Sequence, residues 1–132
     1  MVAAAQQTTG RIVQVLGPVV DIVFPPDQLP EIYNSVEVTR DDGSILTLEV
    51  QSHLGNDWVR AVAMSSTDGL RRGMDAVNTG KAIAVPVGKE TLGRILNVVG
   101  EPIDQAGPVE ATQSSPIHRN APGFDEQATA VE

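Results

Sequence analysis

The stretch RIVQVLGPVVDIVF, residues 11–24, decides the fold class. Its second half places Val20, Ile22 and Phe24 on one face of an extended chain, because successive side chains of a strand point to opposite sides. The pair Gly17-Pro18 interrupts the stretch, so the residues before and after it read as separate strands. Two successive β-strands are therefore predicted near the start of the chain.

Four more strand-like runs follow. Residues 36–50 contain two alternating runs around Asp42-Gly43, a pair suited to a tight turn with positive φ, which predicts a β-hairpin. The last two runs are residues 58–64 and 82–87. This spacing is typical of a small closed barrel or a sandwich. Closure removes the exposed edges of a sheet, so we predict a small six-stranded closed barrel.

The composition supports a mainly β protein and excludes several function classes. Eighteen Val and eight Ile favour strands, because branched side chains lose less freedom there. Cysteine is absent, so neither a disulfide framework nor a thiolate site can form. The net charge of −8 repels a phosphate backbone, which argues against a nucleic-acid partner. The sequence holds no apolar run long enough to predict insertion into a membrane.

The composition changes near Gly88. Residues 89–92 fit one helical turn, and residues 93–100 form a short apolar segment that reads as the first buried piece of another domain. Residues 101–132 contain four prolines among polar side chains, so this tail is predicted to be largely extended or disordered. Residues 1–9 lack the pattern of a secretion signal and read as a flexible leader.

Two Gly-Lys pairs invite comparison with the phosphate-binding loop G-x-x-x-x-G-K-[ST]. Lys81 is followed by Ala, Lys89 is followed by Glu, and neither pair has a glycine five positions earlier. The loop needs both glycines and the hydroxyl to hold phosphate and Mg²⁺. We therefore predict that both pairs are strand-end turns, and that the chain contains no catalytic and no cofactor-binding residue.

The other polar residues also give no reactive site. His53 and His118 lack carboxylates or thiols at metal-ligand spacing, which argues against a metal site, and His53 is predicted to end a strand at the surface. The serines beside Pro116 read as loop residues, since they lack a base and an orienting carboxylate. Glu101 and Asp104 lie in a Pro- and Gly-rich turn and read as solvated loop charges.

Trp58 and Arg60 are the candidate contact residues. They are two positions apart in a predicted strand and therefore share a face, on which a guanidinium can lie over an indole. Trp and Arg are enriched at interface hot spots, which favours a subunit interface. Ordinary barrel packing with an extended Arg explains the pair equally well, so both interpretations stay open.

Four segments together resemble the beta subunit of F-type ATP synthases. They are GRIVQVLGPVVD at residues 10–21, the barrel segment at residues 59–73, TLGRILNVVGEPID at residues 91–104, and PIHR with the following AP at residues 116–122. The L-G-R…G-x-P-x-D part is shared with the alpha subunit and with flagellar and type III export ATPases. The barrel segments and PIHR favour the beta subunit.

The resemblance implies a domain organisation. Residues 10–82 would form the N-terminal barrel, one part of a collar that holds the alternating alpha3-beta3 ring together. Residues 83–132 would be the incomplete start of a RecA-like α/β nucleotide-binding domain. The phosphate loop, the Mg²⁺ ligands and the general base of the family lie beyond Glu132, so Mg-ATP or ADP would bind only to the complete subunit and this portion alone would be inactive.

The resemblance also implies a cellular role. The complete enzyme would be a proton-translocating ATP synthase that makes ATP from ADP and phosphate, with the alpha and gamma subunits as partners. It would lie peripherally on the cytoplasmic face of an energy-coupling membrane. Two alternatives remain: the N-terminal part of an export ATPase, and a free-standing small barrel that binds oligonucleotides or peptides, which the negative charge disfavours.

Overall fold

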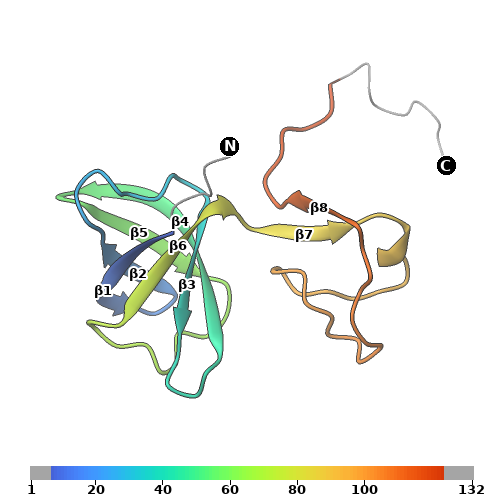
Figure 1. Ribbon diagram of the computed structural model, residues 1–132, viewed down its shortest axis with the longest axis horizontal. Coiled ribbons are helices and arrows are strands. Elements are labelled where there is room, and N and C mark those ends of the chain that lie inside the picture. The colour runs from blue at the N-terminus through green and yellow to red at the C-terminus, as the bar shows by residue number, and fades with distance from the viewer. Residues whose placement is uncertain (1–6, 124–132) are drawn as a thin grey trace.

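The computed structural model describes residues 7–123 (Figure 1). Six strands come first: β1 (Thr8–Leu16), β2 (Val19–Val23), β3 (Asn34–Thr39), β4 (Ile45–Gly55), β5 (Trp58–Ala63) and β6 (Asp75–Ala82). They are followed by β7 (Ala84–Val87), the short 3-10 helix η1 (Lys89–Thr91) and β8 (Gln113–Pro116). Most of the predicted leader and the end of the predicted tail, residues 1–6 and 124–132, lie outside the described residues.

The first six strands form a closed antiparallel barrel. Its order is β1-β2-β5-β4-β3-β6, and the pairing of β1 with β6 closes it. The hairpin predicted around Asp42-Gly43 is present as β3 and β4, which pair from Ser35 opposite Glu49 to Thr39 opposite Ile45. The prediction of a six-stranded closed barrel is confirmed.

The predicted position of the sixth strand, residues 82–87, is wrong. The sixth barrel strand is β6, which pairs with both β1 and β3. Residues 84–87 form β7, which leaves the barrel and pairs with β8 in a separate two-stranded sheet. The inward-facing positions of β6 are Ala76 and Asn78, which are small or polar and give no alternating apolar signal.

The core lies inside the barrel and explains the alternation in the sequence. Its buried side chains are Ile12, Val20, Ile22, Phe24, Val36, Val38, Leu46, Leu48, Val50, Val59, Ala61 and Ala76. Burial of these apolar side chains is the main force that holds the strands together. Gly10 also faces this core, and a Cβ placed there would lie 2.6 Å from the carbonyl oxygen of Val23.

Three polar residues are buried although their position in the strand points them outward. Asp21 lies between core residues of β2, Ser35 adjoins the core residue Val36 on β3, and Glu49 lies between core residues of β4. Side chains alternate across a strand, so all three occupy the outer face of the wall. Other parts of the chain must therefore cover them.

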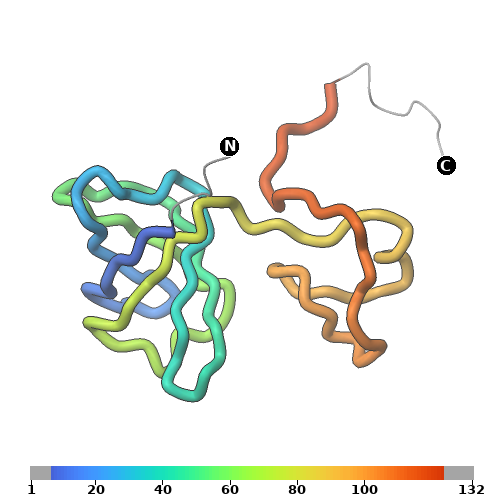
Figure 2. The backbone as a smooth tube through the Cα atoms, in the orientation of Figure 1, coloured from blue at the N-terminus to red at the C-terminus, as the bar shows by residue number. Residues whose placement is uncertain are grey.

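The chain beyond the barrel forms a smaller unit beside it, joined through β6 and β7 (Figures 1 and 2). It contains the β7–β8 sheet, η1, and a loop closed by the bridge between Leu96 and Pro102. The predicted helical turn at residues 89–92 is confirmed as η1. Residues 7–123 contain no α-helix, so the RecA-like α/β start is not seen in them, and none of their helical segments could span a bilayer.

Candidate subunit interface

Trp58 and Arg60 lie on the outer face of β5. They alternate with Val59 and Ala61, which are fully buried in the core. Both outward side chains are only partly covered, which agrees with the shared face predicted for them. Whether this face meets another subunit stays a prediction.

The guanidinium of Arg60 is anchored on the buried carboxylate of Asp21. Arg60 Nε donates to Oδ1 at 2.9 Å and Nη2 donates to Oδ2 at 3.1 Å, while Gln14 Nε2 donates to Oδ2 at 2.5 Å. Asp21 is 1% exposed, whereas the Arg60 side chain is 43% exposed. Two-point contacts of this kind fix the orientation of an Arg side chain.

The electrostatics of this pair follow from its hydrogen bonds. The hydrogen bonds from Arg60 are the main reason why the pKa of Asp21 is lowered, and the hydrogen bond from Gln14 lowers it further. Burial of the carboxylate acts in the opposite direction and raises the pKa. The same contact raises the pKa of Arg60. The carboxylate therefore stays ionised within the wall, and the exposed part of the guanidinium stays charged at the surface.

Sequence analysis missed Asp21 as a partner of Arg60. The residue sits in an alternating run that reads as an ordinary half-buried strand. Its contact with Arg60 depends on the pairing of β2 with β5, in which Asp21 lies directly opposite Arg60. A lone Asp in an otherwise apolar strand is the only local signal that such a partner exists.

The two histidines have different partners. His53 is in β4, two residues before its end, and its Nε2 lies 2.7 Å from the carbonyl oxygen of Pro30. His118 follows β8, and its Nε2 lies 2.9 Å from Oε1 of Glu49. Within residues 7–123, no group of three or more His, Cys, Asp or Glu residues is arranged to hold a metal ion.

Asp104 is not the solvated loop charge that was predicted. Its side chain is 12% exposed and accepts from Arg94 Nε at 2.8 Å and from the backbone N–H groups of Ile95 and Ala106. Hydrogen bonds from Arg94 first, and then from these two amides, lower its pKa. Glu101 has a different partner, the amide of Asn97, so the two carboxylates do not form a catalytic pair.

The barrel region gives the family of the chain. The model of the ATP synthase alpha/beta family, beta-barrel domain, matches residues 12–80, which is more than half of the sequence. The chain belongs to the ATP synthase alpha/beta family. The matched region includes β5, so Trp58 and Arg60 lie within the part of the chain that matches the family's barrel.

Membership of the ATP synthase alpha/beta family places the chain among the F-, V- and flagellar-type ATPases, in which the barrel implies assembly into a hexameric ring.

Because ATPases bind a nucleotide, the surroundings of the two Gly-Lys pairs matter. Gly80 lies within β6 at φ 77°, and Gly88 follows β7 directly at φ 115°. Each glycine thus lets the chain turn where a strand ends or bends.

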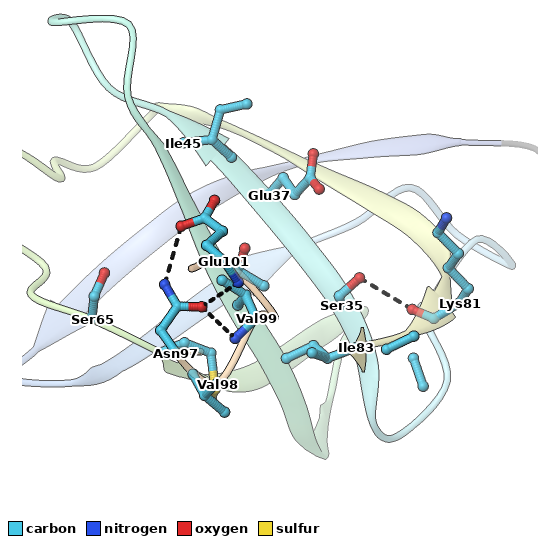
Figure 3. Close-up of a pocket in the computed structure, with 14 residues that line it drawn as sticks. Ser35, Glu37, Ile45, Ser65, Lys81, Ile83, Asn97, Val98, Val99 and Glu101 are labelled. Carbon is cyan, nitrogen blue, oxygen red and sulfur yellow. Dashed lines mark hydrogen bonds between the residues drawn. The ribbon is translucent and has the colours of Figure 1, made fainter. Parts of the chain in front are cut away.

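Lys81 lines a cavity of about 460 Å³ between the barrel wall and the loop at residues 97–101 (Figure 3). In Figure 3 the carboxylates of Glu37 and Glu101 also belong to its lining. A lining that holds two carboxylates and one ammonium does not favour an anionic phosphate. This cavity is therefore a poor site for a nucleotide phosphate.

Proposed function

We propose that the chain is the N-terminal part of the catalytic beta subunit of an F-type ATP synthase, the enzyme that makes ATP from ADP and phosphate with a transmembrane proton gradient. The family match over residues 12–80 supports an ATPase of this group. The choice of the beta subunit rests on the barrel segments and on PIHR at residues 116–119. In the complete enzyme the chain would lie peripherally on the cytoplasmic face of the membrane, with alpha and gamma subunits as partners.

The role of this portion is to join neighbouring subunits in the ring. The observation that carries this role is the partly exposed Trp58–Arg60 face, whose guanidinium is held in place by the buried carboxylate of Asp21. A side chain fixed before binding loses little conformational entropy when a partner arrives. Trp and Arg also carry a large share of the binding energy at protein interfaces.

Nucleotide chemistry belongs to the downstream part of the complete subunit. In this proposal β7, η1 and β8 are the start of its RecA-like nucleotide-binding domain, and Mg-ATP binds only when that domain is complete. The chain alone should neither bind nor hydrolyse Mg-ATP. Isothermal titration calorimetry with Mg-ATP tests this, and a micromolar dissociation constant would contradict it.

Co-expression with an ATP synthase alpha subunit tests the assembly role. We expect the two chains to co-purify and to form a mixed complex in native mass spectrometry. Trp58→Ala should weaken this association about thirtyfold or more, because truncation of a Trp hot spot costs about 2 kcal/mol or more. Ile45→Ala is the matched control, since it removes a 60% exposed apolar side chain from β4.

Each variant is first checked by thermal unfolding, so that a weakened barrel is not mistaken for a weakened interface. Association that is equally strong in the wild type and Trp58→Ala would refute the placement of the interface on β5. Failure of the wild-type chain to bind alpha would refute the assignment to the beta subunit.

A further inference from the structure

Glu49 is a carboxylate buried in the outer wall of the barrel. It is 4% exposed and lies between Leu48 and Val50, which point into the core. An outward carboxylate is normally solvated, and its burial is costly unless it is paired and hydrogen-bonded. Some other part of the chain must therefore cover and compensate it.

His118 supplies that cover from the far end of the described chain. Its Nε2 lies 2.9 Å from Glu49 Oε1, and Gln51 Nε2 donates to the same oxygen at 2.7 Å. Glu49 Oε2 is buried and has no hydrogen-bond partner among residues 7–123. A carboxylate only accepts hydrogen bonds, so Nε2 of His118 carries the shared proton. His118 and Gln51 together provide the side-chain hydrogen bonds of this carboxylate.

Tyr33 holds the other side of the imidazole. The rings of Tyr33 and His118 stack with their centroids 4.2 Å apart and their planes 24° from parallel. Tyr33 is fixed to the barrel, because its backbone N–H donates to the carbonyl of Val50 at 2.8 Å. The imidazole thus has one nitrogen on a carboxylate and one face on a phenol ring, and both of these belong to the barrel.

The β7–β8 pairing leads directly to this contact. Ile117 N donates to Ile83 O at 2.9 Å, which continues the pairing of β8 past its last strand residue to the junction of β6 and β7. Ile83 is itself buried. His118 is the next residue, so the returning chain reaches the barrel wall at the point where Glu49 needs a partner.

We propose that Glu49, Tyr33 and His118 form a clasp that fastens the returning chain to the barrel and fixes the orientation of the β7–β8 sheet. Without the clasp, the covalent link between β6 and β7 is the main tether, and the sheet can pivot about Ile83. With it, the sheet is held at two points. The chain that continues beyond His118 then leaves from a fixed position on the barrel wall.

Amide hydrogen exchange of the 132-residue chain, measured by NMR, tests the clasp. In His118→Ala, exchange at the Ile117 amide should rise about tenfold or more, because a hydrogen bond to a buried charge contributes at least about 1.4 kcal/mol. The core amide of Leu48 should keep its exchange rate. In Glu49→Gln the amide can still accept from His118, so the rise at Ile117 should be smaller.

The matched control is His53→Ala, which removes the other histidine and its contact with Pro30. This variant should leave exchange at Ile117 unchanged. Exchange at Ile117 within about twofold of wild type in His118→Ala would overturn the clasp. Equal acceleration at Leu48 and Ile117 would also overturn it, since that would mean general loss of stability and not local release.

Discussion

Gly10→Ala probes a close approach of β1 and β2 in the barrel. The new Cβ would lie 2.6 Å from the carbonyl oxygen of Val23, 2.9 Å from Cδ1 of Phe24 and 3.0 Å from Cγ2 of Ile22. The two side chains can adjust by rotation. The carbonyl of Val23 cannot, because it belongs to β2, which is held between β1 and β5. The strands must therefore separate locally.

The expected cost follows from these contacts. Overpacking a core costs about 1–3 kcal/mol, and the rigid backbone contact places this site near the upper end of that range. Replacing glycine by alanine also reduces the conformational entropy of the unfolded chain, which stabilises the folded state by about 0.4–1 kcal/mol. The net loss in the free energy of unfolding should be about 2 kcal/mol, which lowers Tm by roughly 8–10 °C for a domain of this size.

Thermal and urea unfolding followed by circular dichroism measure this loss. Gly123→Ala is the control, because a Cβ at that position meets no atom within 4 Å. We expect the control to unfold with the wild type. A Gly10→Ala variant within about 0.5 kcal/mol of wild type would show that β1 and β2 can move apart freely, which would refute the rigid closed wall.

Three further predictions concern the core, acid stability and the loop at Asp104. Leu48→Ala should lower the free energy of unfolding by about 3 kcal/mol, because it leaves a cavity in a fully buried site, and an unchanged urea midpoint would contradict this. Arg60 lowers the pKa of Asp21 in the folded protein, so the pair stabilises the fold at a pH above 3.8, the ordinary pKa of an Asp side chain. This contribution is lost as the pH falls through the lower pKa of Asp21 in the folded state. Asp21→Asn should therefore reduce stability at pH 7 and weaken its decline in acid, and an unaltered pH profile from urea titrations would refute the role of the pair. Asp104→Asn should speed amide exchange at Ile95 while the barrel keeps its Tm, and protection of Ile95 as in the wild type would contradict the loop's dependence on this carboxylate.

The fold could be predicted where large side chains alternate. Residues 11–24 predict β1 and β2 correctly, because Ile12, Val20 and Ile22 all face the core. The same rule failed for β6, whose inward positions include Ala76 and Asn78. These small or polar residues fit because β6 closes the barrel against β1, where Ala76 lies opposite Gly10. Closure is a non-local requirement, so a pattern of neighbouring residues cannot reveal it.

The candidate site was predictable only in part, for the same reason. Strand periodicity alone places Trp58 and Arg60 on one face. The anchoring of Arg60 on Asp21 needs the pairing of β2 with β5, which skips two intervening strands in the chain order. The ion pair between Arg60 and Asp21 therefore depends on the order of the strands in the sheet, whereas local periodicity gives only the direction in which each side chain points.

The two carboxylates buried in the outer wall differ in where their partners come from. Asp21 is satisfied by Gln14 of β1 and Arg60 of β5, so its partners lie wholly within the barrel. Glu49 depends on Gln51 of its own strand and on His118, which lies far beyond the region matched by the family model at residues 12–80. Loss of one partner of a buried ion leaves a cost of several kcal/mol, so the wall around Glu49 is complete only when the returning chain is in place. The outer surface of the barrel is therefore finished by a segment that lies outside the region matched by the barrel model, residues 12–80.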